Sequence, residues 1–311
     1  MSPPRSAARP LPATMDVVYT WVDGNWPGYA DLMQRYSPTK LELNPERYRD
    51  LHQLLRYSLR SLEQFCPWAR QIVFFTCRPQ VPAWLRRDHP KVRIVHHDEV
   101  MDPAILPTFS SNTIENHLHC IPGLTPQFLY LNDDFLFGRA TGIADFFTAD
   151  GRIKVLGTLV GEHPSFRIYE ARHRLISLGF IEHTPILIDG ELLADAIATR
   201  PAEIAATFAQ RFRTDDQVRM DYLYRQYLLA HRRDRAVAEP CWRLLRYHRF
   251  HKIMHRPAAE RRAFDRLRQL RPKFYCLNDD QRDTPHPTVN ALVREFLQEL
   301  YPQPSSFEND V

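Results

Sequence analysis

The sequence predicts an α/β fold with a mostly parallel sheet that helices cover on both faces. Short apolar, β-branched segments alternate with helical patterns through residues 15–150, which is typical of parallel sheets. After that point the pattern loosens into helical runs, and we expect this second half to pack on the sheet and complete a site. With 311 residues, 44% of them hydrophobic, the chain can bury one large core.

Four segments of the first half have the composition of strands. Each is rich in Val, Ile, Phe, Tyr or Leu, and turn signals such as Asp23-Gly24 follow or separate them. The predicted strands are 16–22, 71–77, 92–96 and 127–131.

Apolar residues at helical spacing predict the helices. In the segment 46–65, for example, Leu51, Leu55, Leu59 and Leu62 recur on one face. A short helix is also expected in the Pro-containing loop between the second and third strands. The other predicted helices are 112–119, 191–210, 217–230 and 288–301.

The chain is expected to form one domain with short ends. Residues 1–14 are Pro-rich and predict a disordered lead; 15–150 form the α/β core, 151–302 a mainly helical completion, and 303–311 a tail. No apolar stretch is long enough to span a membrane, and the lead has no apolar signal-peptide region, so we expect a cytoplasmic protein. Five cysteines without a CxxC pair favour reduced, buried thiols over disulfides or a zinc site.

Two adjacent carboxylates follow the fourth predicted strand, in the segment Asn132-Asp133-Asp134. In a parallel sheet, the loops after the strands share one edge, and ligands bind there. Carboxylates at that edge could hold a divalent cation or a sugar hydroxyl. A turn capped by Asn and Asp is the alternative.

A basic segment, residues 232–273, holds fourteen Lys or Arg against four Asp or Glu. Such a segment could bind phosphates or an acidic polymer, could associate with the inner face of a membrane, or could be a solvated helical face. A nucleic-acid module with Tyr247, Phe250, Phe264 and Phe274 as stacking groups would leave the acidic pair unexplained, so no nucleic-acid partner is expected.

Four groups of sequence blocks resemble the Stealth family, and they occur in the family's order along nearly the whole chain. The first is MDVVYTWVDG at 15–24, and the second runs from LLRYSLRSLEQFCPWARQIVFFT at 54–76 through VHHDEVM at 95–101 and LPTFSSNTIENHLHCIPGL at 106–124 to FLYLNDDFLF at 128–137. The third is HTPILIDGELL at 183–193, and the fourth is KFYCLNDD at 273–280 with LYPQPSSFE at 300–308.

This resemblance implies a hexose-1-phosphate transferase with a nucleotide-sugar transferase (GT-A/Rossmann-like) core. The implied reaction moves a sugar 1-phosphate from a UDP-sugar to a glycan hydroxyl, with Mg²⁺ or Mn²⁺ as cofactor and UMP as the second product. Synthesis of capsule or exopolysaccharide is the implied pathway. A conventional glycosyltransferase that attacks the sugar C1 and releases UDP is the alternative, because the same fold and acidic pair serve both reactions.

The resemblance also implies the catalytic residues. Asp134 is expected to act in catalysis and metal binding, Glu115 to orient the acceptor or act as general base, and His183 to act as base or to donate to the phosphate. The family's arginine matches either Arg211 or Arg213, and the sequence leaves this choice open.

The substrate-binding residues are expected around the first strand and the acidic pair. Thr20, Trp21 and Asp23 follow that strand and suit nucleotide contacts, while Asn132 and Asp133 are assigned to the donor sugar.

Two further assignments have alternatives of equal weight. Arg56 and Arg60 lie one helical turn apart and could bind one anion, or could form a structural pair with Glu63 or loop carbonyls. Asp279 repeats the Asn-Asp pattern and could bind metal or cap a turn.

Overall fold

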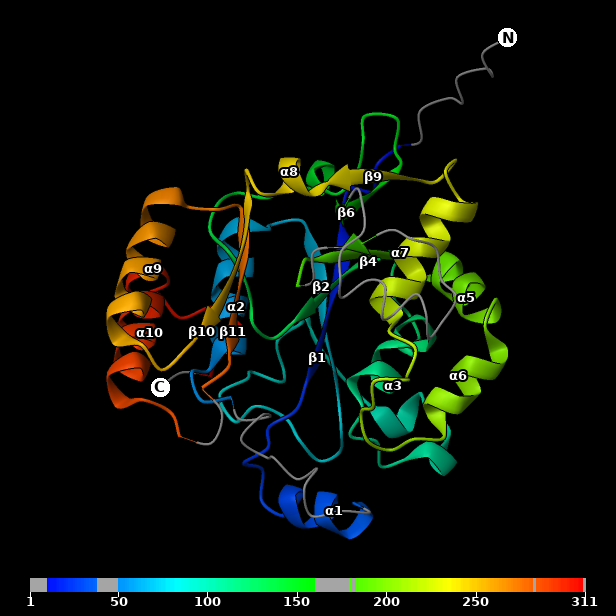
Figure 1. Cartoon of the computed structure of the whole chain (residues 1–311), viewed down its shortest axis with the longest axis horizontal. Coiled ribbons are helices and arrows are strands. Elements are labelled where there is room, and N and C mark those ends of the chain that lie inside the picture. Colours follow the sequence, from blue (N-terminus) through cyan, green and yellow to red (C-terminus); the bar gives the residue numbers. More distant parts are fainter. Residues whose placement is uncertain (1–9, 38–49, 160–178, 181–182, 282–283, 310–311) are drawn as a thin grey trace.

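A five-stranded sheet forms the centre of the computed structural model, which describes residues 10–37, 50–159, 179–180, 183–281 and 284–309 (Figure 1). Its strand order is β3-β2-β1-β4-β8, and every pair is parallel except β4–β8. The mostly parallel sheet predicted from the sequence is thereby confirmed. The strands are β1 (Met15–Trp21), β2 (Ala69–Thr76), β3 (Val92–His96), β4 (Gln127–Asn132) and β8 (Ile186–Asp189).

The central strands form because both of their faces are covered, so that almost every side chain can be apolar. Val17, Val18, Ile72 and Val73 are all fully buried. Helix α2 (Leu54–Phe65) packs Leu55, Leu59 and Leu62 into this core, and Tyr19 and Ser58 share a buried hydrogen bond of 2.8 Å.

Helix α2 also packs against a second sheet. This sheet has the order β10-β11-β5, with β10 (His248–Ile253) parallel to β11 (Phe274–Asp279) and β5 (Phe135–Phe137) antiparallel to β11. Leu54 and Tyr57 of α2 belong to its apolar cluster. The same cluster includes side chains of α9 (Pro257–Leu270) and α10 (Pro287–Leu300), which are side by side at the left of Figure 1.

The second half contains the expected helices but also strands that the sequence did not predict. Four of the six residues of strand β10 (HRFHKI) are His, Arg or Lys, so it lacks the apolar composition on which the strand predictions depended. A third sheet, of order β7-β6-β9, holds β6 (Ile153–Leu159), β7 (Gly179–Phe180) and β9 (Ala236–Pro240). The helices are α5 (Gly190–Ala198), α6 (Pro201–Phe208), α7 (Met220–His231) and α8 (Cys241–Leu244), with α9 and α10 as above.

Several element boundaries differ from the predictions for local reasons. The single helix expected at 191–210 is two helices, because Pro201 has no N–H to continue α5 and instead begins α6. The helix expected at 112–119 stops as α3 (Ser111–Glu115), where the Asn116 side chain donates to the carbonyl of Asn112 at 2.8 Å.

The helix expected at 46–65 begins later and the short helix between β2 and β3 does not form. Residues 46–49 lie outside the described part of the chain, and α2 starts only after Gln53, which has a left-handed backbone with φ of 52°. Between β2 and β3, Pro79 and Pro82 remove backbone donors, and the described chain there consists of turns. Helix α1 (Tyr29–Tyr36) and 3₁₀ turns at His97–Glu99, Pro103–Ile105, Leu118–Cys120 and Ile143–Asp145 complete the elements.

The segment 303–309 packs on α2 through Glu308. The Glu308 carboxylate accepts two hydrogen bonds of 2.7 Å from Arg60 and a further one from Arg56, and it also accepts the backbone N–H of Ser305 at 2.8 Å. Burial raises the pKa of Glu308, but the bonds from Arg60, Ser305 and Arg56 outweigh burial and lower the pKa from 4.5 to about 2. Residues 1–9 of the expected lead lie outside the described part of the chain.

We predict that Glu308→Gln lowers the free energy of unfolding by about 2–3 kcal/mol, because two arginines then lose their buried carboxylate. Because the folded pKa is depressed, this contribution is present above about pH 4.5 and is lost as the pH falls toward 2. Urea unfolding monitored by circular dichroism measures both effects. Glu299→Gln is the matched control, since that exposed carboxylate bonds only Arg268 among the described contacts and should contribute under about 0.5 kcal/mol. Equal losses in the two variants would contradict the prediction.

Candidate active site

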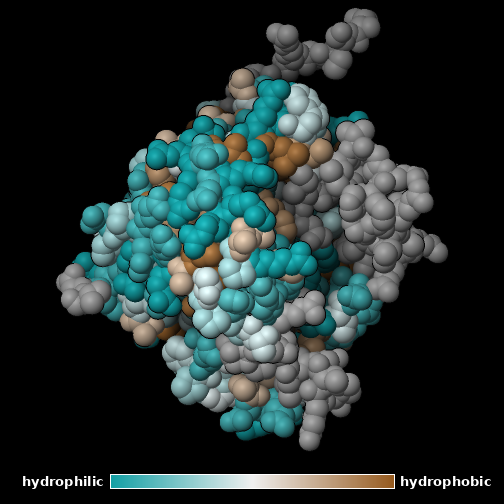
Figure 2. All heavy atoms as spheres, turned by 60° about the vertical axis from the view of Figure 1, so that its left-hand side comes forward, coloured by the Kyte–Doolittle hydropathy of each residue, from teal (hydrophilic) through white to brown (hydrophobic). Residues whose placement is uncertain are grey.

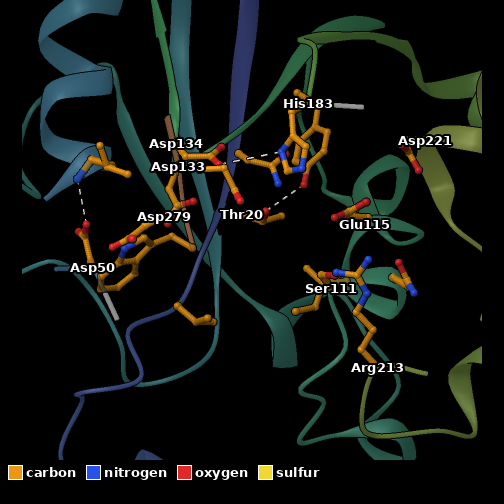
Figure 3. Close-up of a pocket in the computed structure, with 18 of the residues that line it drawn as sticks. Thr20, Asp50, Ser111, Glu115, Asp133, Asp134, His183, Arg213, Asp221 and Asp279 are labelled. Carbon is orange, nitrogen blue, oxygen red and sulfur yellow. Dashed lines mark hydrogen bonds and ion pairs between the residues drawn. The ribbon is translucent and has the colours of Figure 1, made fainter. Parts of the chain in front are cut away.

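A hollow of about 800 Å³ lies at the carboxyl edge of the central sheet (Figure 3). Strands β1 and β4 end there, and β8, which is antiparallel, begins there, so His183 and Thr184 reach the same edge as the loops after the parallel strands. Most of the side chains predicted to act together therefore line one pocket. They are Thr20, Trp21, Glu115, Asn132, Asp133, Asp134, His183, Arg213 and Asp279.

Four carboxylates occupy one side of the pocket in Figure 3, and they are Asp50, Asp133, Asp134 and Asp279. Pairing of β5 with β11 brings the two Asn-Asp segments together, because Phe135 pairs with Cys276 and the N–H of Leu277 donates to the carbonyl of Asp134 at 3.0 Å. Beyond this point, Asn278 Nδ2 donates to Asp134 Oδ2 at 3.2 Å.

The pKa values on this side of the pocket record crowded negative charge. Burial, together with the charges of Asp134 and Asp50, raises the pKa of Asp133 well above its usual range. Burial and the charge of Asp23 raise the pKa of Asp50 to about 6, although the N–H of Leu54 donates to its carboxylate at 2.9 Å.

The opposite side of the pocket holds Glu115, Asp221 and Arg213 (Figure 3). Burial and the charge of Asp221 raise the pKa of Glu115 to about 7, while the charges of Arg219 and Arg213 lower it. Asp221 itself stays ionised: burial raises its pKa, but the charges of Arg219 and Arg225 bring it below the usual value. Arg219 binds Asp221 with two hydrogen bonds, of 3.1 and 2.9 Å. A carboxyl that titrates near neutral pH suits proton transfer.

His183 stands between the two sides of the pocket. Its Nδ1 lies 4.0 Å from Asp134 Oδ2, and its ring stacks on Phe250 with centroids 4.8 Å apart. Its backbone has a left-handed φ of 55°, which is uncommon for a residue other than glycine.

The structure separates the two arginines between which the sequence could not choose. Arg213 lines the pocket, whereas Arg211 donates to the carbonyls of Pro107 and Ala104 at 2.9 and 3.3 Å and stacks on Tyr36. Arg211 therefore holds loops together, and Arg213 is the one that can reach a bound anion.

Three other predicted binding residues do not line the pocket. Arg56 and Arg60 bind Glu308, which corresponds to the structural alternative for this pair, although with Glu308 as the partner and not Glu63. Asp23 closes a turn instead: its N–H donates to Gln80 Oε1 at 2.8 Å, and its carboxylate accepts the N–H of Asn25.

Several pocket residues were not predicted from the sequence, and they are Asp50, Asp221, Arg219, Arg225 and Lys252. Asp221 and Arg225 lie on the inward face of α7 with exposures of 9% and 3%, and Arg225 donates to Thr184 Oγ1 at 2.6 Å. Charged residues on a mostly buried helix are the sequence signal that could have identified them.

The acidic side of the pocket fits a divalent cation. Asp134 Oδ1 is buried and accepts no hydrogen bond from the described residues, and a cation beside Asp133 and Asp134 would relieve their mutual repulsion. Asp279 is less free to bind one, since His52 Nε2 lies 3.1 Å from its carboxylate.

A second arrangement, of Asp134, His183 and Cys276, brings three ligand atoms within 4.8 Å of one another. Cys276 is fully buried, and burial raises the pKa of its thiol well above 9.0, so it stays protonated. Hard cations such as Mg²⁺ prefer oxygen ligands, which favours the carboxylates over this thiol.

Comparison with known families agrees with this arrangement of residues. Two Stealth regions match the chain, conserved region 2 at residues 47–155 and conserved region 4 at residues 265–311. The chain belongs to the Stealth family. The first of these regions contains Glu115 and the Asp133-Asp134 pair, and the second contains Asp279.

Similar Stealth-type proteins carry names that refer to polysaccharides. The chain is 34% identical over 318 residues to the exopolysaccharide phosphotransferase SCO6023 of Streptomyces coelicolor, a match covering 94% of the chain and 52% of the relative. It is 30% identical to the capsular polysaccharide phosphotransferase SacB of Neisseria meningitidis serogroup A, with 94% and 57% covered. The chain thus spans about half the length of these relatives.

Among solved structures, the galactosyltransferase LgtC in complex with donor and acceptor sugar analogues has a TM-score of 0.47 and 14% identity, covering 94% of this chain and 97% of that one. The fold assignment rests instead on the strand order described above. Within the described residues, no helix is long and apolar enough to cross a membrane.

We predict that the Glu115 carboxyl titrates near pH 7 and that Asp221→Asn lowers this midpoint. The negative charge of Asp221 opposes ionisation of Glu115, and neutral asparagine removes that opposition. Carbon-13 NMR of labelled glutamate side chains, assigned with Glu115→Gln, measures the titration. Asp195→Asn on α5 is the control, because that carboxylate interacts with Arg232 and Tyr227 and should leave Glu115 unchanged. A midpoint near the ordinary value of 4.5 would contradict the assignment.

Proposed function

We propose that this chain transfers a sugar 1-phosphate, of the hexose or N-acetylhexosamine type, from a UDP-sugar to a glycan hydroxyl. The product is a phosphodiester, and UMP is the second product. The observation that carries the proposal is the pocket itself. On one side, Glu115, with a pKa of about 7, lies with Arg213, and a group of acidic residues lies on the opposite side. The names of the polysaccharide phosphotransferases that resemble the chain support the same reaction class.

In the proposed reaction the acceptor oxygen bonds to the β-phosphorus while the bond from that phosphorus to the bridging oxygen of UMP breaks. Glu115, ionised, takes the acceptor proton, for which a pKa of about 7 is suited. Arg213 binds the oxygens of the diphosphate, since a guanidinium can donate two parallel hydrogen bonds. His183 donates to the transferring phosphate and is oriented by its stack on Phe250.

Asp133 and Asp134 would hold Mg²⁺ or Mn²⁺, with Asp279 as a further candidate. When bound, the cation supplies positive charge that screens the diphosphate from these carboxylates. Asn132 and Asp133 would orient the donor sugar, and Thr20 and Trp21, at the end of β1, would contact the nucleotide.

We predict that the chain, given UDP-N-acetylglucosamine, Mg²⁺ or Mn²⁺ and glycan acceptors, produces UMP. Asp134→Asn should lower turnover by about a hundredfold, because one carboxylate that holds the donor and the cation is lost. Chromatography of the nucleotide products, with mass spectrometry of the glycan, makes the measurement. Release of UDP in place of UMP would refute phosphate transfer and favour attack on the sugar C1, the alternative reaction for the same residues.

We predict that Arg213→Ala lowers turnover by about a hundredfold while Arg211→Ala leaves it within about twofold. Arg211 bonds loop carbonyls, so its loss should instead lower the free energy of unfolding by about 1 kcal/mol. Steady-state kinetics and urea unfolding of both variants separate the two roles. Inactivation by Arg211→Ala without loss of stability would reverse the assignment.

A further inference from the structure

Exposed aromatic and basic side chains lie on β10 beside the pocket and on α8 near the start of that strand, with the buried His248 between them. This strip consists of Lys252, Phe250, Leu245, Arg246, Trp242 and Arg243, all from the basic segment 232–273. Its first residues belong to the pocket: Lys252 lines the pocket and pairs with Asp280 at 2.8 Å, and Phe250 stacks on His183.

Successive side chains of β10 point to opposite faces of the strand, and this alternation determines which of them face the pocket. His251 Nε2 lies 2.6 Å from Glu260 on α9, so this face of the strand is covered by the helix. Phe250 and Lys252 point to the opposite face, because side chains alternate along a strand. Phe250 is 43% exposed. From Lys252 back to the start of β10 the strand rises about 13 Å, at about 3.3 Å per residue.

At the start of β10 the strip reaches α8. Trp242 is 57% exposed, and the guanidinium carbons of Arg243 and Arg246 lie 5.2 and 5.5 Å from its ring centroid. Leu245, which is 49% exposed, is the first residue after α8, and its carbonyl accepts a hydrogen bond from Arg249 of β10. Figure 2 shows a small apolar patch, bordered by hydrophilic residues, near the top of the molecule.

We propose that this strip binds the growing acceptor chain, an oligosaccharide with a phosphodiester in each repeat. The inference rests on the proposed function: each transfer adds one negative charge, so every acceptor longer than the first unit is an anion. Arginines suit the phosphates and the exposed faces of Trp242 and Phe250 suit sugar rings, whose C–H groups stack on aromatic residues. Charge complementarity thus identifies the occupant.

The position of Lys252 and Phe250 at the pocket favours a glycan over a lipid surface. An exposed Trp among arginines would also suit the interface of an anionic membrane. A membrane would have no need of Phe250 and Lys252, however, which extend the strip into the pocket where the acceptor hydroxyl must react.

The test uses acceptors of two lengths and the double variant Trp242→Ala/Arg246→Ala. The probes are N-acetylhexosamine 1-phosphate acceptors of one and of about eight repeats, because a single repeat is shorter than the roughly 13 Å of β10 between the pocket and α8. We expect the KM for the longer acceptor to rise about five- to tenfold. The turnover, the KM for the UDP-sugar and the KM for the shorter acceptor should not change.

A matched control removes two positive charges from a part of the basic segment that lies outside the strip. Arg261→Ala/Arg262→Ala takes two exposed arginines from α9, which lies on the other face of β10, and should leave both acceptor KM values unchanged. An equal rise for both acceptors, or in both double variants, would overturn the strip as the binding site.

Two further outcomes separate the competing explanations. If Trp242→Ala/Arg246→Ala abolishes cosedimentation with phosphatidylglycerol vesicles and leaves the KM for the longer acceptor unchanged, the strip is a membrane surface and the proposal fails. UMP release with unchanged KM values would refute the strip alone. Release of UDP by the unaltered chain would refute the proposed function, and with it the anionic acceptor.

Discussion

The antiparallel pairing of β5 with β11 holds the candidate active site together. Strand β5 follows the Asp133-Asp134 turn directly, and β11 carries Asn278 and Asp279 at its end, so their pairing brings two segments more than a hundred residues apart to one place. Backbone bonds set this approach, and the carboxylates therefore cannot move apart to lower their repulsion. The high pKa of Asp133 has a separate origin, because burial and the charges of Asp134 and Asp50 raise it.

The two sides of the pocket differ in how charged side chains are paired. On the β5–β11 side, the described lining residues include several carboxylates and no arginine, an arrangement suited to holding a cation. On the α3–α7 side, arginines keep Asp221 ionised, and that charge in turn helps to keep Glu115 protonated up to neutral pH. Proton transfer and charge screening are thus proposed for residues on opposite sides of the pocket (Figure 3).

The sequence predicted those parts of the fold that depend on local composition. Strand β3 has the predicted bounds, and β1, β2 and β4 lie within a few residues of theirs, because continuous apolar runs signal a sheet buried on both faces. Strand β8, the fifth strand of this sheet, was not predicted. Strand β10 was missed because its burial pattern comes from the helix and pocket on either side of it, and its own residues are mostly polar.

The site residues also fall into those that the sequence could identify and those that required the structure. Asp134, Glu115 and His183 were recognisable from the blocks around them, whereas the choice between Arg211 and Arg213 required knowing which guanidinium reaches the loop carbonyls. Asp50 could not be predicted, since only the folded chain brings it beside Asp133.

Helix α2 contributes side chains to the apolar cores of both sheets. Leu55 and Leu59 belong to the core of the central sheet, while Leu54 and Tyr57 belong to that of the β10-β11-β5 sheet, so one helix serves as a wall for both. Neither core can lose the helix without exposing apolar surface in the other. The two sheets should therefore melt as a single cooperative unit, and the parts of the pocket that they build share one thermal limit.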